Sequence, residues 1–161
     1  MTDIDRQTKI EHYSKAYDEV VEALNEFPKD MWNFKPTPER WSIHEILIHL
    51  ADSEANSYIR CRKIISESGT KVYGYDQDKW ASVLNYHNQN IDLSLKLFQL
   101  LRQLTYELII NLEDNAWNRY VDHEFYGPIT LVNWLEIYEP HVPGHIRQMK
   151  RVFEEWKSFK S

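Results

Sequence analysis

The chain has 161 residues, 42% hydrophobic and 14% aromatic, and a formal net charge of −6 at pH 7. This length is most simply one domain over residues 1–161, and its apolar content excludes a disordered chain. The acidic balance disfavours nucleic acid as a partner, because nucleic-acid affinity depends on neutralising phosphates with Lys and Arg. Only four glycines are present, which favours long helices over strands joined by tight turns.

Cysteine usage and the N-terminus indicate the compartment. The one cysteine, Cys61, cannot form an internal disulfide, and the N-terminus is polar with no apolar segment of the signal-peptide kind. No apolar run approaches the length of a membrane span, so we expect a cytoplasmic protein without a membrane partner. Cys61 lies in an apolar helical row, and we expect it to be a small buried hydrophobe rather than a nucleophile.

Two long helices are predicted in the first half of the chain. Apolar residues recur at helical spacing from Ile4 to Phe27. Ser42 and Glu45 form a capping-box pattern, so a second helix should begin there and continue to about Ser68, before Gly69. Its expected core residues are Ile43, Ile46, Leu47, Leu50, Tyr58, Cys61 and Ile65.

The middle of the chain is more polar and then becomes helical again. Asp76 is placed to cap a short helix that reaches Trp80. A third long helix is expected over residues 90–112, followed by an irregular segment over residues 113–130. The third helix carries a row of leucines that we expect to pack in the core, namely Leu97, Leu101, Leu104 and Leu108.

Thr130 is a suitable N-cap for a last helix, whose apolar row continues to Trp156. Four long helices, with no internal repeat and no linker, predict an all-α fold, a four-helix bundle. Pro140, Pro143 and Gly144 interrupt the last helix. Because prolines remove backbone donors and kink helices, we expect a kink at this point.

Three histidines form the most informative pattern. His141 and His145 are four residues apart, so their imidazoles can project side by side from one face of the last helix. They follow the apolar row of that helix, and His49 flanks the apolar row of the second helix. Inward-facing imidazoles need partners for both nitrogens and are costly without a shared ligand. The pattern therefore predicts a divalent-metal site with positions open for water or substrate.

Other histidine-based sites are less consistent with the spacing. His44 and His49 are five residues apart, which places them about 140° apart around a helix and excludes the metalloprotease HExxH motif. The last helix has no inward-facing Glu-x-x-His motif, which disfavours a di-iron bundle. An iron site of two histidines and a carboxylate is a weaker alternative. His123 precedes the last helix, where it could border the mouth of a site or be an ordinary loop residue.

Segments spread from residue 31 to residue 150 resemble a known family in their order and spacing. They are Trp41-Ser42, His49 to Ser53, Tyr58 to Arg60, Tyr75-Asp76 with Trp80-Ala81, His123-Glu124 with Gly127 and Thr130, and Tyr138 with His141, His145, Ile146 and Gln148. Together they resemble the DinB-like superfamily, and within it the YfiT-type metal-dependent hydrolases and bacillithiol transferases.

The resemblance implies a four-helix bundle that binds a divalent metal, usually zinc or nickel. The family's three histidine ligands correspond to His49, His141 and His145. Members are commonly homodimers, so the resemblance implies a homodimer here. Some members transfer low-molecular-weight thiols, such as bacillithiol or mycothiol, onto electrophiles, and many have no assigned reaction.

These observations lead to a functional hypothesis. Three neutral imidazoles leave a divalent ion its full charge, which lowers the pKa of a bound water or thiol. We therefore expect an enzyme of the thiol S-transferase or hydrolase kind, in which a thiol or water attacks an electrophilic small molecule. Tyr138, Glu54 and Asp52 are the candidates for catalytic roles that orient ligands or substrate.

The alternative hypothesis is a non-catalytic, metal-binding helical-bundle stress protein. Glu54 stands where YfiT-type sequences often carry another histidine, and it could close the coordination sphere as a fourth ligand. The two hypotheses differ in turnover, since both predict metal binding and only the first predicts a reaction.

Overall fold

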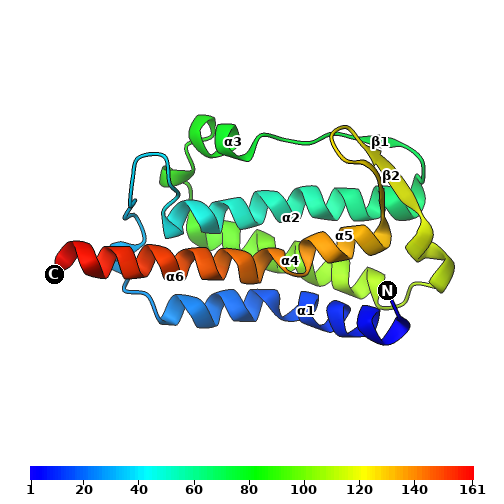
Figure 1. Ribbon diagram of the computed structural model, residues 1–161, viewed down its shortest axis with the longest axis horizontal. Helices are drawn as coiled ribbons and strands as arrows, with labels where there is room; N and C mark the ends of the chain where they lie inside the picture. The colour runs from blue at the N-terminus through cyan, green and yellow to red at the C-terminus, as the bar shows by residue number, and fades with distance from the viewer.

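The computed structural model describes residues 1–161, and its long helices run side by side as a bundle (Figure 1). The helices of the bundle are α1 (Asp3–Asn25), α2 (Ile43–Ser66), α4 (Ile91–Ile109), and α5 (Leu131–Tyr138) followed by α6 (His141–Lys160). The predicted four-helix bundle is confirmed, with α5 and α6 together as its fourth member. None of the helices combines the length and hydrophobicity that a membrane span requires.

The connections contain short helices, namely α3 (Gln77–Val83), η1 (Lys29–Met31), η2 (Tyr86–Asn88) and η3 (Asp114–Asn118). The helix starts follow the predicted caps. Ser42 Oγ accepts from the Glu45 amide at 3.2 Å, and Glu45 Oε2 accepts from the Ser42 amide at 2.8 Å. The side chains of Asp76 and Thr130 likewise accept backbone amides at the starts of α3 and α5. Each cap satisfies an amide that has no partner within its helix.

A small sheet covers one end of the bundle, where an irregular segment was expected. β1 (Lys71–Val72) pairs in parallel with β2 (Tyr120–His123), which pairs antiparallel with β3 (Gly127–Thr130). Gly127 has a φ of +68°, a conformation that glycine adopts without strain, and it lies next to the turn between β2 and β3. Val121 of β2 is buried in the core. The scarcity of glycine in the chain therefore did not exclude a hairpin.

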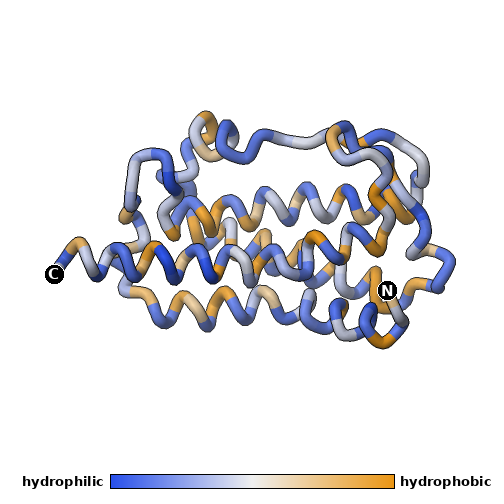
Figure 2. The backbone as a smooth tube through the Cα atoms, in the orientation of Figure 1, coloured by the Kyte–Doolittle hydropathy of each residue, from blue (hydrophilic) through white to orange (hydrophobic).

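The core consists mainly of two clusters of buried apolar side chains, of 14 and 12 residues. Hydrophobic and hydrophilic stretches alternate along the bundle helices, as amphipathic helices require (Figure 2). The core expected on α2 is largely confirmed: Ile43, Ile46, Leu47, Leu50 and Cys61 are buried, and Tyr58 and Ile65 are partly buried. Burial raises the pKa of the Cys61 thiol to about 12, which agrees with a structural rather than a nucleophilic cysteine.

The face that α4 turns to the core differs from the prediction. Leu97 and Leu104 are 45% and 47% exposed, so the expectation that the leucine row packs in the core is wrong. The residues that α4 buries are Phe98, Arg102, Thr105 and Ile109. This buried face combines the apolar side chains of Phe98 and Ile109 with Arg102, whose Nη2 lies 2.6 Å from Glu54 Oε2. A buried charge requires a buried partner, which Glu54 supplies. With this face turned inward, Leu97 and Leu104 lie on the opposite side of α4 and are exposed.

The predicted kink in the last helix is a break between α5 and α6 at Glu139 and Pro140. Pro143 is the third residue of α6. Proline has no backbone N–H, and an N–H in the first turn would have no acceptor within the helix, so none of its hydrogen bonds is lost. The helix therefore continues past Pro143. His141 and His145 lie on the same side of the break, so they keep the spacing of one helical turn.

Candidate metal centre

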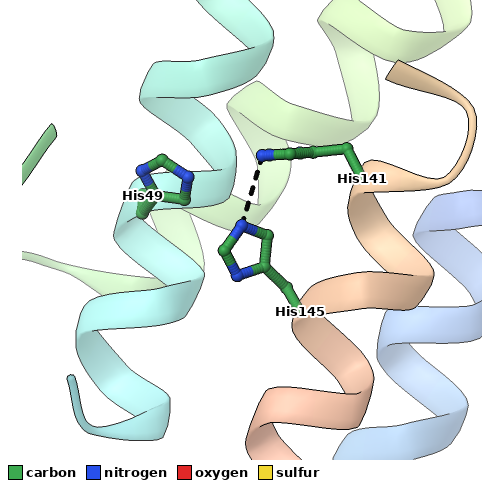
Figure 3. A group of neighbouring side chains, drawn as sticks. All are labelled: His49, His141 and His145. Atoms are coloured by element: carbon green, nitrogen blue, oxygen red, sulfur yellow. Dashed lines mark hydrogen bonds between the residues drawn. The ribbon is translucent and has the colours of Figure 1, made fainter. Parts of the chain in front are cut away.

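Three histidines from two helices point toward one another inside the bundle (Figure 3). His49 comes from α2, and His141 and His145 come from the first two turns of α6. One ligand atom from each lies within 4.8 Å of those of the other two, so the group could hold a metal ion. The ring centroids of His141 and His145 are 4.6 Å apart, and the ring centroid of His49 is 4.8 Å from that of His145. The structure thus brings together the residues predicted as ligands.

The hydrogen bonding of His49 fits a metal ligand. Its side chain is buried, and neither Nδ1 nor Nε2 has a hydrogen-bond partner. A buried polar group left unsatisfied costs about 1–3 kcal/mol, so such groups are rare without a functional reason. A metal ion bound to one of these nitrogens would remove part of that cost, since the imidazole lone pair is a good ligand for zinc and nickel.

His145 is oriented by a neighbour on its own helix. Its Nδ1 lies 2.9 Å from Oε1 of Gln148. Because the amide oxygen can only accept, Nδ1 carries the proton and Nε2 keeps its lone pair. Nε2 of His145 lies 3.2 Å from Nε2 of His141, the contact drawn as a dashed line in Figure 3. The Gln148 contact is the kind that orients metal-ligating histidines in proteins.

Burial keeps all three imidazoles neutral. Loss of solvent, together with His145, lowers the pKa of His49 to about 3. Loss of solvent lowers the pKa of His141 to about 2, and Arg102 and any protonated neighbouring histidine would repel a proton there. The pKa of His145 is also lowered by burial. Neutral imidazole is the form that binds metals, so the three side chains are ready to ligate near pH 7.

Aromatic side chains and a small cavity surround the histidine group. The ring of Trp41 lies 4.7 Å from that of His49 and 6.5 Å from that of His145. A cavity of about 230 Å³ opens beside His145, and its lining includes Trp41, Gln77 and Gln148. A small molecule that enters this cavity would reach the edge of the histidine group.

Two of the three predicted catalytic residues lie near the histidines. The ring of Tyr138 is 6.1 Å from that of His141, and the Tyr138 hydroxyl accepts from Nη1 of Arg60 at 2.8 Å. Asp52 lies one helical turn after His49, and its Oδ2 accepts from the Tyr86 hydroxyl at 2.5 Å.

The third predicted catalytic residue, Glu54, lies in the bundle interior and is not part of the histidine group. It accepts from the Tyr13 hydroxyl at 2.5 Å and pairs with Arg102. Nη1 of Arg102 lies 3.5 Å from the carbonyl oxygen of Tyr138. Arg102 therefore links Glu54 to the end of α5, three residues before His141. Arg102 was not identified from the sequence, because it lies among leucines on a helix that looks amphipathic with this position outward.

The remaining histidines have other contacts. Nε2 of His44 lies 2.9 Å from the carbonyl oxygen of Gln89. His44 is thus outside the histidine group, as its spacing from His49 predicted. His123 lies in β2, where its Nδ1 accepts from the Phe125 amide at 3.2 Å.

The fold and the histidine group define the class to which the protein belongs. The model of the DinB superfamily matches residues 12–149, which is most of the chain. The chain therefore belongs to the DinB superfamily, as its sequence pattern indicated.

Individual relatives agree with this class. YfiT of Bacillus subtilis is 33% identical over 118 residues, which are 68% of this chain and 64% of that protein. OB0782 of Oceanobacillus iheyensis is 31% identical over 106 residues, which are 66% of this chain and 61% of that protein. Both are provisionally named metal-dependent hydrolases, and the matches span less than two thirds of each relative's length.

The fold is also that of a solved structure. The structure of YfiT from Bacillus subtilis, described as a probable metal-dependent hydrolase with an unusual four-helix bundle topology, matches with a TM-score of 0.88. The match covers 98% of this chain and 90% of the YfiT chain at 23% identity. At this identity the likeness shows the shared fold.

Proposed function

We propose that this protein is a divalent-metal-dependent enzyme that acts on an electrophilic small molecule, with zinc or nickel held by His49, His141 and His145. The strongest support is the buried His49 side chain, whose two nitrogens lack partners and which faces two further neutral imidazoles. The names of the relatives point to metal-dependent hydrolysis. A divalent ion with three neutral ligands and open positions supplies Lewis-acid activation of a thiol or a water.

The surrounding residues would orient the ligands and the substrate. Gln148 favours the tautomer of His145 in which Nδ1 carries the proton and Nε2 is unprotonated. Tyr138 accepts a hydrogen bond from Arg60, so its own hydroxyl proton remains available for a substrate or leaving group. In this proposal Asp52 orients the turn of α2 that follows His49. Glu54 is a positioning residue that acts through Arg102.

Both versions of the reaction are substitutions at an electrophilic atom. In thiol transfer, the thiol sulfur forms a bond to the electrophilic carbon, the leaving group departs with the bonding electrons, and the thiol proton passes to solvent. In hydrolysis, a water oxygen takes the place of the sulfur. The substrate is therefore a small molecule with a displaceable group, and a low-molecular-weight thiol is the second substrate of the transferase version.

Metal content is the first test of the proposal. Untagged wild type and His141→Ala, both purified without chelator, are compared by mass spectrometry of the metal. Near-stoichiometric zinc or nickel in the wild type, lost in the variant, supports the site. A wild type that contains no metal and takes up none when zinc or nickel is added overturns it.

Turnover separates the two reactions and the non-catalytic alternative. A transferase should consume monochlorobimane only when a thiol is added, forming a C–S bond and releasing chloride. A hydrolase should cleave model esters or amides without added thiol. Failure of both assays with metal-loaded protein contradicts the enzyme proposal and favours a metal-binding bundle protein without a reaction.

We also infer a homodimer in the cytoplasm. α4 exposes Leu93, Leu97, Leu100 and Leu104 by 45–64%, which is a continuous apolar row at a spacing of three and four residues. If the α4 helices of two copies pack antiparallel about a two-fold axis between residues 100 and 101, Leu97 of one copy faces Leu104 of the other. The lone buried Cys61, with no disulfide in the chain, suits a reducing compartment.

A further inference from the structure

A second cavity lies along α2 and shares no lining residue with the one beside His145. Its volume is about 530 Å³, and it is lined by α2 and by the segment of residues 71–80. This segment, which contains β1 and the start of α3, runs over α2 (Figure 1). The α2 residues that line the cavity include Asn56, Ile59 and Lys63, whose spacing of three and four residues puts them on one helical face.

The charges in this cavity are opposite in sign to the net charge of the chain. Arg60, Lys63 and Lys71 line it, whereas the whole chain carries a net charge of −6. Lys63 pairs with Glu67 at 3.2 Å, where both groups are exposed to solvent. The one carboxylate in the lining, Asp52, already accepts the Tyr86 hydroxyl. A bond from a neutral hydroxyl leaves Asp52 its charge, so the lining holds three cations against one carboxylate and is positive on balance.

Apolar surface lies next to these cations. Ile59 is 53% exposed and Tyr73 is 71% exposed, and the partly buried ring of Trp80 completes the wall. Small-molecule sites are typically concave and apolar, with a few charged groups that orient the ligand. A ligand matched to this surface carries an apolar body and an anionic group.

We propose that this cavity is a second small-molecule site that takes an organic anion with an aromatic or aliphatic body. The anionic group contacts Lys63 and Lys71, and the body lies against Ile59 and Trp80. Arg60 reaches from this site toward the metal centre, since it donates to the Tyr138 hydroxyl at 2.8 Å and to the Tyr73 carbonyl at 3.0 Å. No histidine of the metal centre lines this site, although Asp52 and Arg60, which the proposed function also uses, do. The proposal therefore rests on the cations and the apolar wall of the cavity and not on a bound metal.

The test uses 4-phenylbutyrate as the probe and its neutral amide, 4-phenylbutanamide, as the matched compound. Both are titrated into ¹⁵N-labelled protein and followed by two-dimensional NMR. We expect the carboxylate to shift the resonances of Val72 and of the Trp80 indole, and to bind about fivefold more tightly than the amide. Added salt should remove this difference, because it screens exposed charges.

A double variant, Lys63→Gln with Lys71→Gln, should weaken carboxylate binding about fivefold and leave amide binding unchanged. The matched control is Lys15→Gln with Lys157→Gln, which removes the same charge. Lys157 pairs with Glu154 within its helix much as Lys63 pairs with Glu67, so the control also removes one such pair. The control should bind the carboxylate as the wild type does.

Three outcomes overturn the proposal: no binding of the carboxylate, equal binding of carboxylate and amide at low salt, or shifts centred on Trp41 and Gln148. The last outcome would place the probe at the metal centre. The same titration of metal-free His141→Ala should give the wild-type affinity. A failure of the metal-centre proposal is therefore distinguishable from a failure of this one.

Discussion

His49 and His145 face the same point but are held in different ways. Gln148 fixes the ring of His145 through its Nδ1, whereas His49 has no hydrogen bond and is held by packing against Trp41. The orientation of His145 therefore depends on its contact with Gln148 at Nδ1 and on its contact with His141 at Nε2. The orientation of His49 depends on the surrounding side chains and on any ion that it binds.

The Gln148 contact leads to a prediction about metal affinity. Gln148→Leu should weaken zinc binding about 10–100-fold. The substitution removes the hydrogen-bond acceptor that orients the His145 ring and that makes Nε2 a stronger metal ligand. Competition with a chromophoric chelator measures the affinity. Gln7→Leu, at an exposed position of α1, is the control and should bind as the wild type does. Equal affinity of Gln148→Leu and wild type would contradict the orienting role.

The pKa of His49 leads to a prediction about stability and pH. His49 has a pKa of about 3 when folded and about 6.5 when unfolded, so the unfolded chain binds more protons between these values. The contribution of neutral His49 to the stability of the metal-free protein should therefore be fully present above pH 6.5 and be lost as the pH is lowered toward 3. From pH 7 to pH 5, His49 should account for about 2 kcal/mol of this loss.

Urea unfolding in the presence of a chelator measures this pH dependence. His49→Leu should lose correspondingly less stability between pH 7 and pH 5, whereas His12→Gln, at an exposed position, should behave as the wild type. A stability of the metal-free wild type that does not change over this range would show that the histidines do not titrate as a buried group.

At the scale of elements, the buried ion pair of Glu54 and Arg102 joins α2 to α4 and lies beside the end of α5. Arg102→Met should lower the free energy of unfolding by about 3–5 kcal/mol, because Glu54 would remain buried without its partner. Glu54→Leu combined with Arg102→Met should recover much of this loss, because no charge is then left in the core. Urea unfolding measures both variants. A double variant no more stable than Arg102→Met would argue against the unpaired charge as the cause.

At the scale of the whole molecule, the exposed leucines of α4 predict a dimer. Leu100, which lies nearest the proposed two-fold axis, is 58% exposed. Leu100→Glu should convert a dimeric wild type into a monomer, since two carboxylates would meet at the two-fold axis. Analytical ultracentrifugation measures the mass. Leu84→Glu, at a position 47% exposed outside this row, should remain dimeric, and a monomeric wild type would contradict the inferred interface.

The expectation of one domain over residues 1–161 is also a prediction at this scale. The two main core clusters both contain residues of α1, α2 and α4, so neither is confined to one half of the chain. Unfolding by urea should therefore be a single transition that coincides when followed by tryptophan fluorescence and by far-UV circular dichroism. Two separated transitions would contradict one domain.

The sequence by itself determined the features that depend on local patterns. Helical spacing of apolar residues located the bundle helices, and short-range capping by Ser42, Asp76 and Thr130 located three helix starts. The same periodicity placed His49 and the pair His141 and His145 on inward faces. Each of these inferences needs only residues within about one or two turns of each other, where geometry is set by the helix itself.

Only the tertiary structure decided the features that depend on distant residues. Arg102 is buried with Glu54, 48 positions earlier in the chain, as its partner, and Leu97 and Leu104 on the opposite side of α4 are exposed. The pairing of β1 with β2 joins residues about 50 positions apart, and it lies next to the second cavity. Such contacts are selected by the packing of the whole chain and by the pairing of buried charges, neither of which leaves a periodic signal in the sequence.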